Sequence, residues 1–114
     1  MPKVVITLAL PGPAEELLRA EAEVKVLEEI LPPERYREEI RGANALLPQL
    51  RDRIDEQALE AAGPQLQVVS NYAVGLDNID VAACTRRGIL VGHTREVQRQ
   101  NCEALIWAIT YLAN

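Results

Sequence analysis

Five short apolar runs divide the chain, and between them apolar residues recur at the spacing of a helix. Runs rich in valine, isoleucine and leucine and bounded by turn residues predict buried strands, whereas apolar residues three and four positions apart predict one-sided helices. The predicted strands are residues 4–8, 24–27, 43–47, 66–69 and 89–91, and the predicted helices are 14–22, 33–40, 54–62, 80–87 and a final one at about 95–112.

This alternation predicts an α/β fold of flavodoxin-like form, with residues 1–114 as a single domain. We expect a five-stranded parallel sheet in the order 2-1-3-4-5 with helices on both faces, in three layers, because that order needs only right-handed crossovers. The second strand should lie at an edge of the sheet, since Glu23 and Lys25 place charges where they discourage pairing with another chain.

Polar residues and glycines predict where the helices begin and end. Either Asp52 or Asp55 can cap the helix that Gly63 ends, and Asp77 and Asn78 can cap the helix that follows the fourth strand. The choice between Asp52 and Asp55 stays open at this point, because both have the side chain that an N-cap needs.

The turn after the fourth strand is the predicted ligand site. Ser70 and Asn71 close the strand, and Gly75 allows either a positive φ or a close approach of the backbone to a ligand. Backbone N–H groups left free in such a turn, next to the start of a helix, form an anion pocket without any charged side chain. A carboxylate would suit this pocket.

Charge and apolar content restrict the partners. The chain has 17 acidic and 12 basic residues, a net charge of −5, which opposes binding to nucleic acid or to anionic membranes. No apolar run approaches the roughly 20 residues of a membrane helix, and the N-terminus is interpreted as a strand and not as a signal peptide. We therefore expect a cytoplasmic protein.

The residues most often used in catalysis are not placed for it here. His93 has no Ser, Cys or carboxylate beside it in a recognised motif, and Cys84 should face inward on a short helix. Cys84 and Cys102 lack the spacing of a metal or redox site, so we predict reduced structural thiols. Residues 8–13 lack the glycine pattern of a phosphate loop, and residues 8–10 and 47–49 lack the acidic residues of a response regulator. No catalytic, metal-binding or cofactor-binding residue is predicted.

Two consecutive segments carry a resemblance to a known family. Residues 71–80 read Asn-Tyr-Ala-Val-Gly-Leu-Asp-Asn-Ile-Asp, and residues 82–91 read Ala-Ala-Cys-Thr-Arg-Arg-Gly-Ile-Leu-Val. The pair resembles the substrate domain of the D-2-hydroxyacid dehydrogenases, in particular the glyoxylate and hydroxypyruvate reductase branch, and the likeness extends from about Lys3 to Thr94. The resemblance implies a flavodoxin-like domain of an enzyme that reduces 2-oxo acids with NAD(P)H.

The resemblance also implies a substrate site. In that family, backbone amides at the positions of Val74 and Gly75 hold the carboxylate of the acid. The predicted substrate-binding residues are accordingly Ala73, Val74 and Gly75, together with Leu47 and Arg51 from the end of the third strand. Arg51 could reach an acidic ligand, although an arginine in a polar loop is more often only solvated.

The resemblance ends after Thr94. The family continues into a nicotinamide-binding domain, and the arginine, carboxylate and histidine of its chemistry have no matching position in this chain. We therefore expect an engineered single domain from which the cofactor domain was removed, joined near Gly92 to Glu96, with no cofactor and no catalytic activity of its own. The final helix then corresponds either to the interdomain helix or to the C-terminal helix of the family.

Two functions remain open from the sequence. One is an isolated substrate domain that binds small 2-oxo or 2-hydroxy acids weakly, with the preferred acid undetermined. The alternative is a flavodoxin-like structural or self-associating engineered domain without a ligand. In either case we expect a monomer or a weak homo-oligomer.

Overall fold

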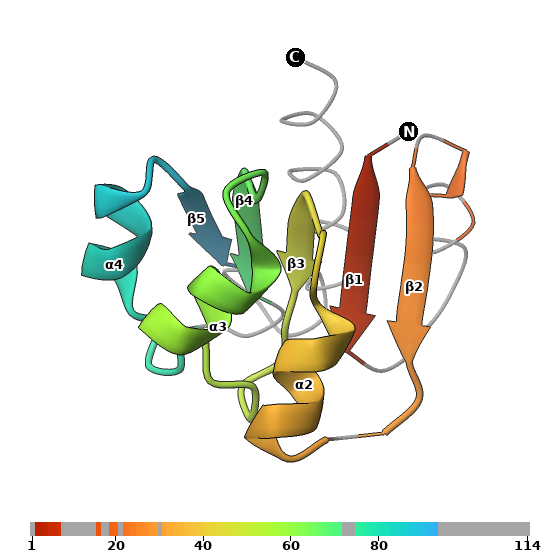
Figure 1. The fold of residues 1–114 in the computed structure, drawn as a ribbon, viewed down its shortest axis with the longest axis horizontal. Helices are drawn as coiled ribbons and strands as arrows, with labels where there is room; N and C mark the ends of the chain where they lie inside the picture. The colour runs from red at the N-terminus through yellow and green to blue at the C-terminus, as the bar shows by residue number, and fades with distance from the viewer. Residues whose placement is uncertain are drawn as a thin grey trace.

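Five parallel strands form the frame of the fold in the computed structural model, which describes residues 2–7, 16, 19–20, 22–29, 31–71 and 75–93. They lie side by side in the order β2-β1-β3-β4-β5 (Figure 1), which confirms the predicted sheet. The strands are β1 (Lys3–Thr7), β2 (Glu23–Leu27), β3 (Ala45–Leu47), β4 (Val68–Asn71) and β5 (Leu90–His93).

The first strand lies inside the sheet. Val4 pairs with Val24 of β2 on one side and with Ala45 of β3 on the other. A strand buried on both faces needs apolar residues on both, which explains the continuous apolar run from Val4 to Ile6 in β1. The edge position predicted for β2 is confirmed, and there Lys25 forms a salt bridge to Glu39.

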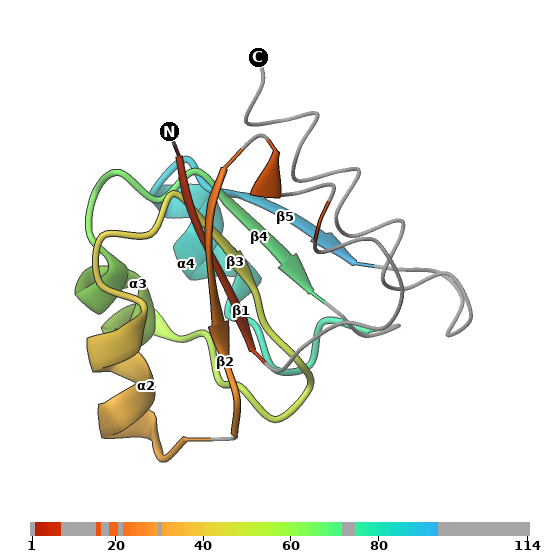
Figure 2. The same ribbon diagram turned by 90° about the vertical axis from the view of Figure 1, so that its right-hand side faces the viewer.

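The described helices cover one face of this sheet. They are α2 (Pro33–Glu39), α3 (Glu56–Ala62) and α4 (Val81–Arg86), and Figure 2 shows all three on the same side of the strands. Tyr36, Ile40 and Leu59 from this side pack in one apolar cluster with Val5 and Leu46 of the sheet. The predicted helices 14–22 and 95–112 lie largely or wholly outside the described residues.

The opposite face of the sheet is also removed from solvent. Val4, Ile6, Leu47 and Val68 alternate with the residues of the apolar cluster along their strands, and none of the four is more than 1% exposed. Both faces of the sheet are therefore buried, as parallel sheets require.

Two aspartates cap the helices that follow β3 and β4. The side chain of Asp55 accepts a hydrogen bond from the backbone N–H of Ala58 at 3.0 Å, and that of Asp80 accepts one from Ala83 at 3.0 Å. Each carboxylate satisfies a backbone donor that has no partner within its helix.

Three of the predicted capping residues have other roles. Asp52 accepts a hydrogen bond from the backbone N–H of Gln49 at 2.8 Å, so it is not the cap of α3. Asp77 and Asn78 do not cap α4 either, because the helix begins only at Val81. The prediction for this helix was therefore wrong by about two residues.

Cys84 lies on the inner side of α4 and is fully buried, as predicted. Burial, together with the nearby charge of Asp80, raises the pKa of its thiol to about 11. A thiol in this environment is a weak nucleophile at neutral pH, because the reactive thiolate is scarce.

Replacing Leu59 with alanine should lower the free energy of unfolding by about 2–5 kcal/mol, because its fully buried side chain would leave a cavity against the sheet. Urea unfolding measures the loss. The matched control is Leu50→Ala, whose side chain is 58% exposed and should change stability by no more than about 0.5 kcal/mol. Equal losses for the two variants would contradict this placement of the core.

Candidate functional site

The loops that follow β3 and β4 meet at the carboxyl edge of the sheet. Ile54 and Ile79 form an isolated parallel bridge there. The backbone N–H of Ile54 donates to the carbonyl of Asn78 at 2.9 Å, and the N–H of Asp80 donates to the carbonyl of Ile54 at 2.8 Å. Ligands of open α/β sheets bind outside this edge, so the joined loops form the candidate site.

A reciprocal pair of side-chain amides joins the two ends of the second loop. Asn71 Nδ2 donates to Asn78 Oδ1 at 2.8 Å, and Asn78 Nδ2 donates to Asn71 Oδ1 at 3.1 Å. Asn71 Nδ2 also donates to the carbonyl of Gly75 at 2.9 Å. Because Asn71 is fully buried, these bonds replace those that its amide would make to water.

Asn78 also connects this loop to its neighbour. Its Nδ2 atom donates to the carbonyls of Gln49 and Asp52, at 3.0 Å and 2.9 Å. The sequence did not reveal this role, because a short polar residue before a helix is first interpreted as a cap. The only available signal was the presence of two asparagines, Asn71 and Asn78, on either side of a glycine-containing turn.

The turn between these asparagines presents unused backbone donors. Within the part of the chain that the structure describes, the N–H groups of Gly75, Leu76 and Asp77 donate to no partner. Gly75 and Asp77 are exposed and Leu76 is half-buried, so an anion in solution could reach this segment. Three neighbouring N–H donors provide the chemistry of a carboxylate site.

Of the two reasons that the sequence offered for a glycine at position 75, a positive φ or a close approach to a ligand, the positive φ is not found. Gly42, Gly63 and Gly88 have positive φ values, but Gly75 does not. A Cβ built on Gly75 would meet no atom within 4 Å. The backbone here is unstrained and open to solvent, so the reason for a glycine at this position is not a left-handed conformation.

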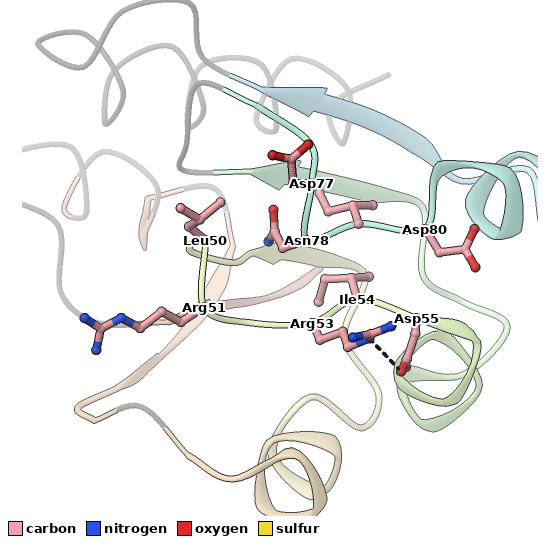
Figure 3. Close-up of a pocket in the computed structure, with 9 residues that line it drawn as sticks. Leu50, Arg51, Arg53, Ile54, Asp55, Asp77, Asn78 and Asp80 are labelled. Carbon is pink, nitrogen blue, oxygen red and sulfur yellow. Dashed lines mark ion pairs between the residues drawn. The ribbon is translucent and has the colours of Figure 1, made fainter.

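A surface pocket of about 540 Å³ opens beside the joined loops (Figure 3). Arg53 forms an ion pair with Asp55 at 3.7 Å, and Arg51 extends away from the other lining side chains. Among the described residues, the side chains of Arg51 and Asp77 form no hydrogen bond or ion pair. The pocket is lined by Leu50, Arg51, Arg53, Ile54, Asp55, Asp77, Asn78, Ile79 and Asp80.

The predicted site residues converge only in part. Arg51 lines the pocket, whereas Leu47 is buried in β3 with 1% exposure and Gly75 lies in the exposed turn, and neither lines the pocket. Ala73 and Val74 lie outside the described residues. The side-chain charges of this pocket do not favour an anion, because Asp77, Asp80 and Asp55 outnumber the two arginines.

A second polar cluster is buried at the end of β1. Gln49 Nε2 donates to the carbonyl of Thr7 at 2.8 Å, which connects β1 to the loop after β3. The Thr7 hydroxyl lies beside Tyr36 and Asp52 and has no hydrogen-bond partner among the described residues. Burial raises the pKa of both Tyr36 and Asp52, and for Tyr36 the charge of Asp52 adds to the effect.

The segment after β1 lacks the glycine pattern of a dinucleotide site. Rossmann folds bind the pyrophosphate at a glycine-rich turn after the first strand, but β1 is followed by Leu-Ala-Leu-Pro-Gly-Pro. The described residues also contain no group of three or more His, Cys, Asp or Glu side chains that could hold a metal ion. In the same residues, no helix has both the length and the apolar content to cross a membrane.

Comparison with known proteins identifies a family. Residues 4–104 match the D-isomer specific 2-hydroxyacid dehydrogenase family, catalytic domain. The chain is 47% identical over 98 residues to a glyoxylate reductase of Pyrococcus furiosus and 42% identical over 110 residues to one of Thermococcus kodakarensis. These alignments cover 84% and 95% of this chain, but only 29% and 33% of the relatives.

Solved structures show the same likeness. The TT0316 protein from Thermus thermophilus aligns with a TM-score of 0.76 and 37% identity, over 81% of this chain and 30% of its own. The NAD⁺-bound 3-phosphoglycerate dehydrogenase of Entamoeba histolytica aligns with a TM-score of 0.69 and 27% identity, over 82% and 32%. The chain therefore spans about a third of the proteins that it matches.

The glycines provide a test of backbone strain. A Cβ would have open space at both Gly75 and Gly88, but only Gly88 has a positive φ, of 72°. Gly88→Ala should therefore destabilise the fold by about 1 kcal/mol, whereas Gly75→Ala should leave stability level or raise it by up to about 1 kcal/mol through a stiffer unfolded chain. Urea midpoints at equal m-values measure the stability change of both variants. A lower stability of Gly75→Ala would show that the turn at Gly75 is strained.

Asp52 should make stability depend on pH. Because burial raises its pKa in the folded state, its favourable contribution is present below the unfolded pKa of about 3.9 and is lost as pH rises through the folded value. Asp52→Asn should therefore be more stable than the parent at pH 7 by about 1 kcal/mol, with a difference that shrinks toward pH 3. Urea unfolding of the parent and of Asp52→Asn between pH 3 and pH 7 measures this stability difference.

The exposed Asp77 provides the control for this measurement. Asp77→Asn should change stability by no more than about 0.5 kcal/mol at either pH, because its side chain is not buried. A neutral-pH loss of stability in Asp52→Asn would mean that the charged carboxylate is required in the fold.

Proposed function

Because this chain belongs to the D-isomer specific 2-hydroxyacid dehydrogenase family and corresponds to its catalytic domain, we propose that it binds small 2-oxo acids at the turn after β4. The observation that carries this proposal is the set of unused backbone donors at Gly75, Leu76 and Asp77. Ala73 and Val74, which precede them, are proposed to contribute the remaining contacts to the ligand.

A carboxylate fits this turn because it is an acceptor with two oxygens and needs donors on one side only. Hydrogen bonds from neutral N–H groups to an ionised oxygen are about twice as strong as those between neutral groups. The turn can therefore hold an anion even though aspartates stand nearby. Arg51, whose side chain is exposed, is proposed to add a positive charge at the rim of the same edge.

Glyoxylate is the first acid to test, since the relatives named above are glyoxylate reductases. Leu50 lines the pocket with 58% of its surface exposed and is proposed to cover the carbon end of the acid.

We further propose that this chain does not transfer hydride by itself. The relatives are oxidoreductases by name, and the chain spans only about a third of their length. The lack of a glycine-rich turn after β1 supports this proposal, since a dinucleotide would then have to be held by another part of such an enzyme. A cytoplasmic location, and a monomeric or weakly associated state, remain predictions.

The alternative function, a structural or self-associating domain without a ligand, receives no support from the comparisons. The relatives and solved structures that we compared carry the names of oxidoreductases wherever a function is named. An engineered origin likewise remains only a prediction.

Titration of the ¹⁵N-labelled chain with glyoxylate should shift the amide resonances of Gly75, Leu76 and Asp77 with a Kd of about 1 mM, as expected for a few hydrogen bonds to a small anion. Arg51→Gln should weaken this binding by about threefold and more strongly at low salt, because an exposed charge is screened. NADH mixed with the chain and glyoxylate should not be oxidised above the uncatalysed rate.

Arg35→Gln is the matched control, since Arg35 is also an exposed arginine but lies on α2. This variant should bind glyoxylate as the parent does. Resonance shifts confined to residues outside 71–80 would contradict the proposed site, and sustained NADH oxidation would contradict the proposed lack of activity.

A further inference from the structure

We propose that the amide pair of Asn71 and Asn78 is a positioning device, which aims the N–H donors of the turn before any ligand arrives. This inference rests on the proposed function in one respect, since it assigns those donors to a carboxylate. The pair itself would not touch the ligand, because both amides are occupied by protein partners.

The planar peptide unit explains how a side chain can aim a backbone donor. In a trans peptide the C=O of one residue and the N–H of the next point in opposite directions. Asn71 Nδ2 binds the carbonyl of Gly75, which turns the N–H of Leu76 away from Asn71. The carbonyl of Leu76 in turn accepts from the N–H of Ile79 at 3.0 Å, which directs the N–H of Asp77 away from the loop interior.

The same pair also fixes the position of the turn relative to the neighbouring loop. Asn78 Nδ2 binds the carbonyls of Gln49 and Asp52, which stand on either side of Arg51 in the chain. The two joined amides therefore orient both the N–H donors of the turn, through Asn71, and the backbone from which the arginine extends, through Asn78. Because the acceptors are main-chain atoms, this arrangement does not depend on the identity of their side chains.

The sheet contains a matched polar contact with no part in the proposed site. Asn44 Oδ1 accepts from the backbone N–H of Lys3 at 2.9 Å, and Asn44 Nδ2 donates to the carbonyl of Gln65 at 3.4 Å. Asn44 precedes β3, so it lies at the amino edge of the sheet, opposite the turn. Like Asn78 it is half-buried, so the two residues make a fair comparison.

The test compares Asn78→Ala with Asn44→Ala by amide hydrogen exchange in the ligand-free chain. The N–H groups of Ile54, Ile79 and Asp80 close the joined loops and report on their order. In Asn78→Ala their exchange should accelerate at least about tenfold relative to Asn44→Ala, as the loss of a hydrogen-bonded anchor implies. Equal exchange at these amides in the two variants would overturn the inference.

Glyoxylate binding provides the second measurement. Asn78→Ala should bind glyoxylate about tenfold more weakly than Asn44→Ala, even where the two have the same urea midpoint, because a misdirected N–H costs a hydrogen bond to a charged group. Equal affinity in two folded variants would also overturn the inference. If the parent chain itself shows no shift with glyoxylate, the proposed function fails, and hydrogen exchange alone then decides the positioning role.

Asn71→Asp distinguishes a specific amide role from general loosening, and serves if Asn78→Ala does not fold. At neutral pH the carboxylate it introduces would face the oxygens of Gly75 and Asn78 with no proton to donate. Burial favours the protonated form, which restores one donor. The protection of the Ile79 and Asp80 amides from hydrogen exchange should therefore recover as pH falls toward 5. Because the intrinsic exchange rate also changes with pH, Asn44→Asp measured at the same pH is the control. No recovery relative to that control would contradict the role.

Discussion

The parallel pairing of Ile54 with Ile79 is the constraint on which the rest of the carboxyl edge depends. Both residues are buried, so the backbone groups on either side of them must find partners within the protein. They find them in each other's loops, through an isolated parallel bridge that lies beyond the ends of β3 and β4. Segments that would otherwise be variable surface loops become part of a rigid frame, and a frame of this kind holds a binding turn more accurately than free loops do.

Much of the fold could be predicted because strands buried in a parallel sheet have continuous apolar sequences, which are easy to recognise. The run from Val4 to Ile6 is apolar at every position, and the charges of β2 mark it as an edge strand. The helix ends were harder to predict, because several polar side chains near a helix start can form the cap and their other hydrogen bonds decide which one does. The side chain of Asp52 accepts a hydrogen bond from the backbone N–H of Gln49 and is therefore not available to cap α3. This contact could be identified only in the folded structure.

The candidate site was predicted less completely than the fold, for a related reason. Gly75 was compatible with either a positive φ or an open backbone face, and the sequence could not choose between them; its φ is not positive. The role of Asn78 depends on carbonyls that lie 26 and 29 positions away in the chain, so no local pattern could reveal it. The resemblance to the family located the turn, while the physical reason for its shape required the contacts between the two loops.

The interior position of β1 has a consequence for how the domain assembles. Among the five strands this one is synthesised first, but its partner β3 begins at Ala45, so the centre of the sheet cannot close until the ribosome has released about forty more residues. Until then the apolar run from Val4 to Ile6 has only β2 to pair with, along one side. A folding order set by such distant pairings is slow compared with that of hairpins, and it leaves the growing chain in need of protection from aggregation.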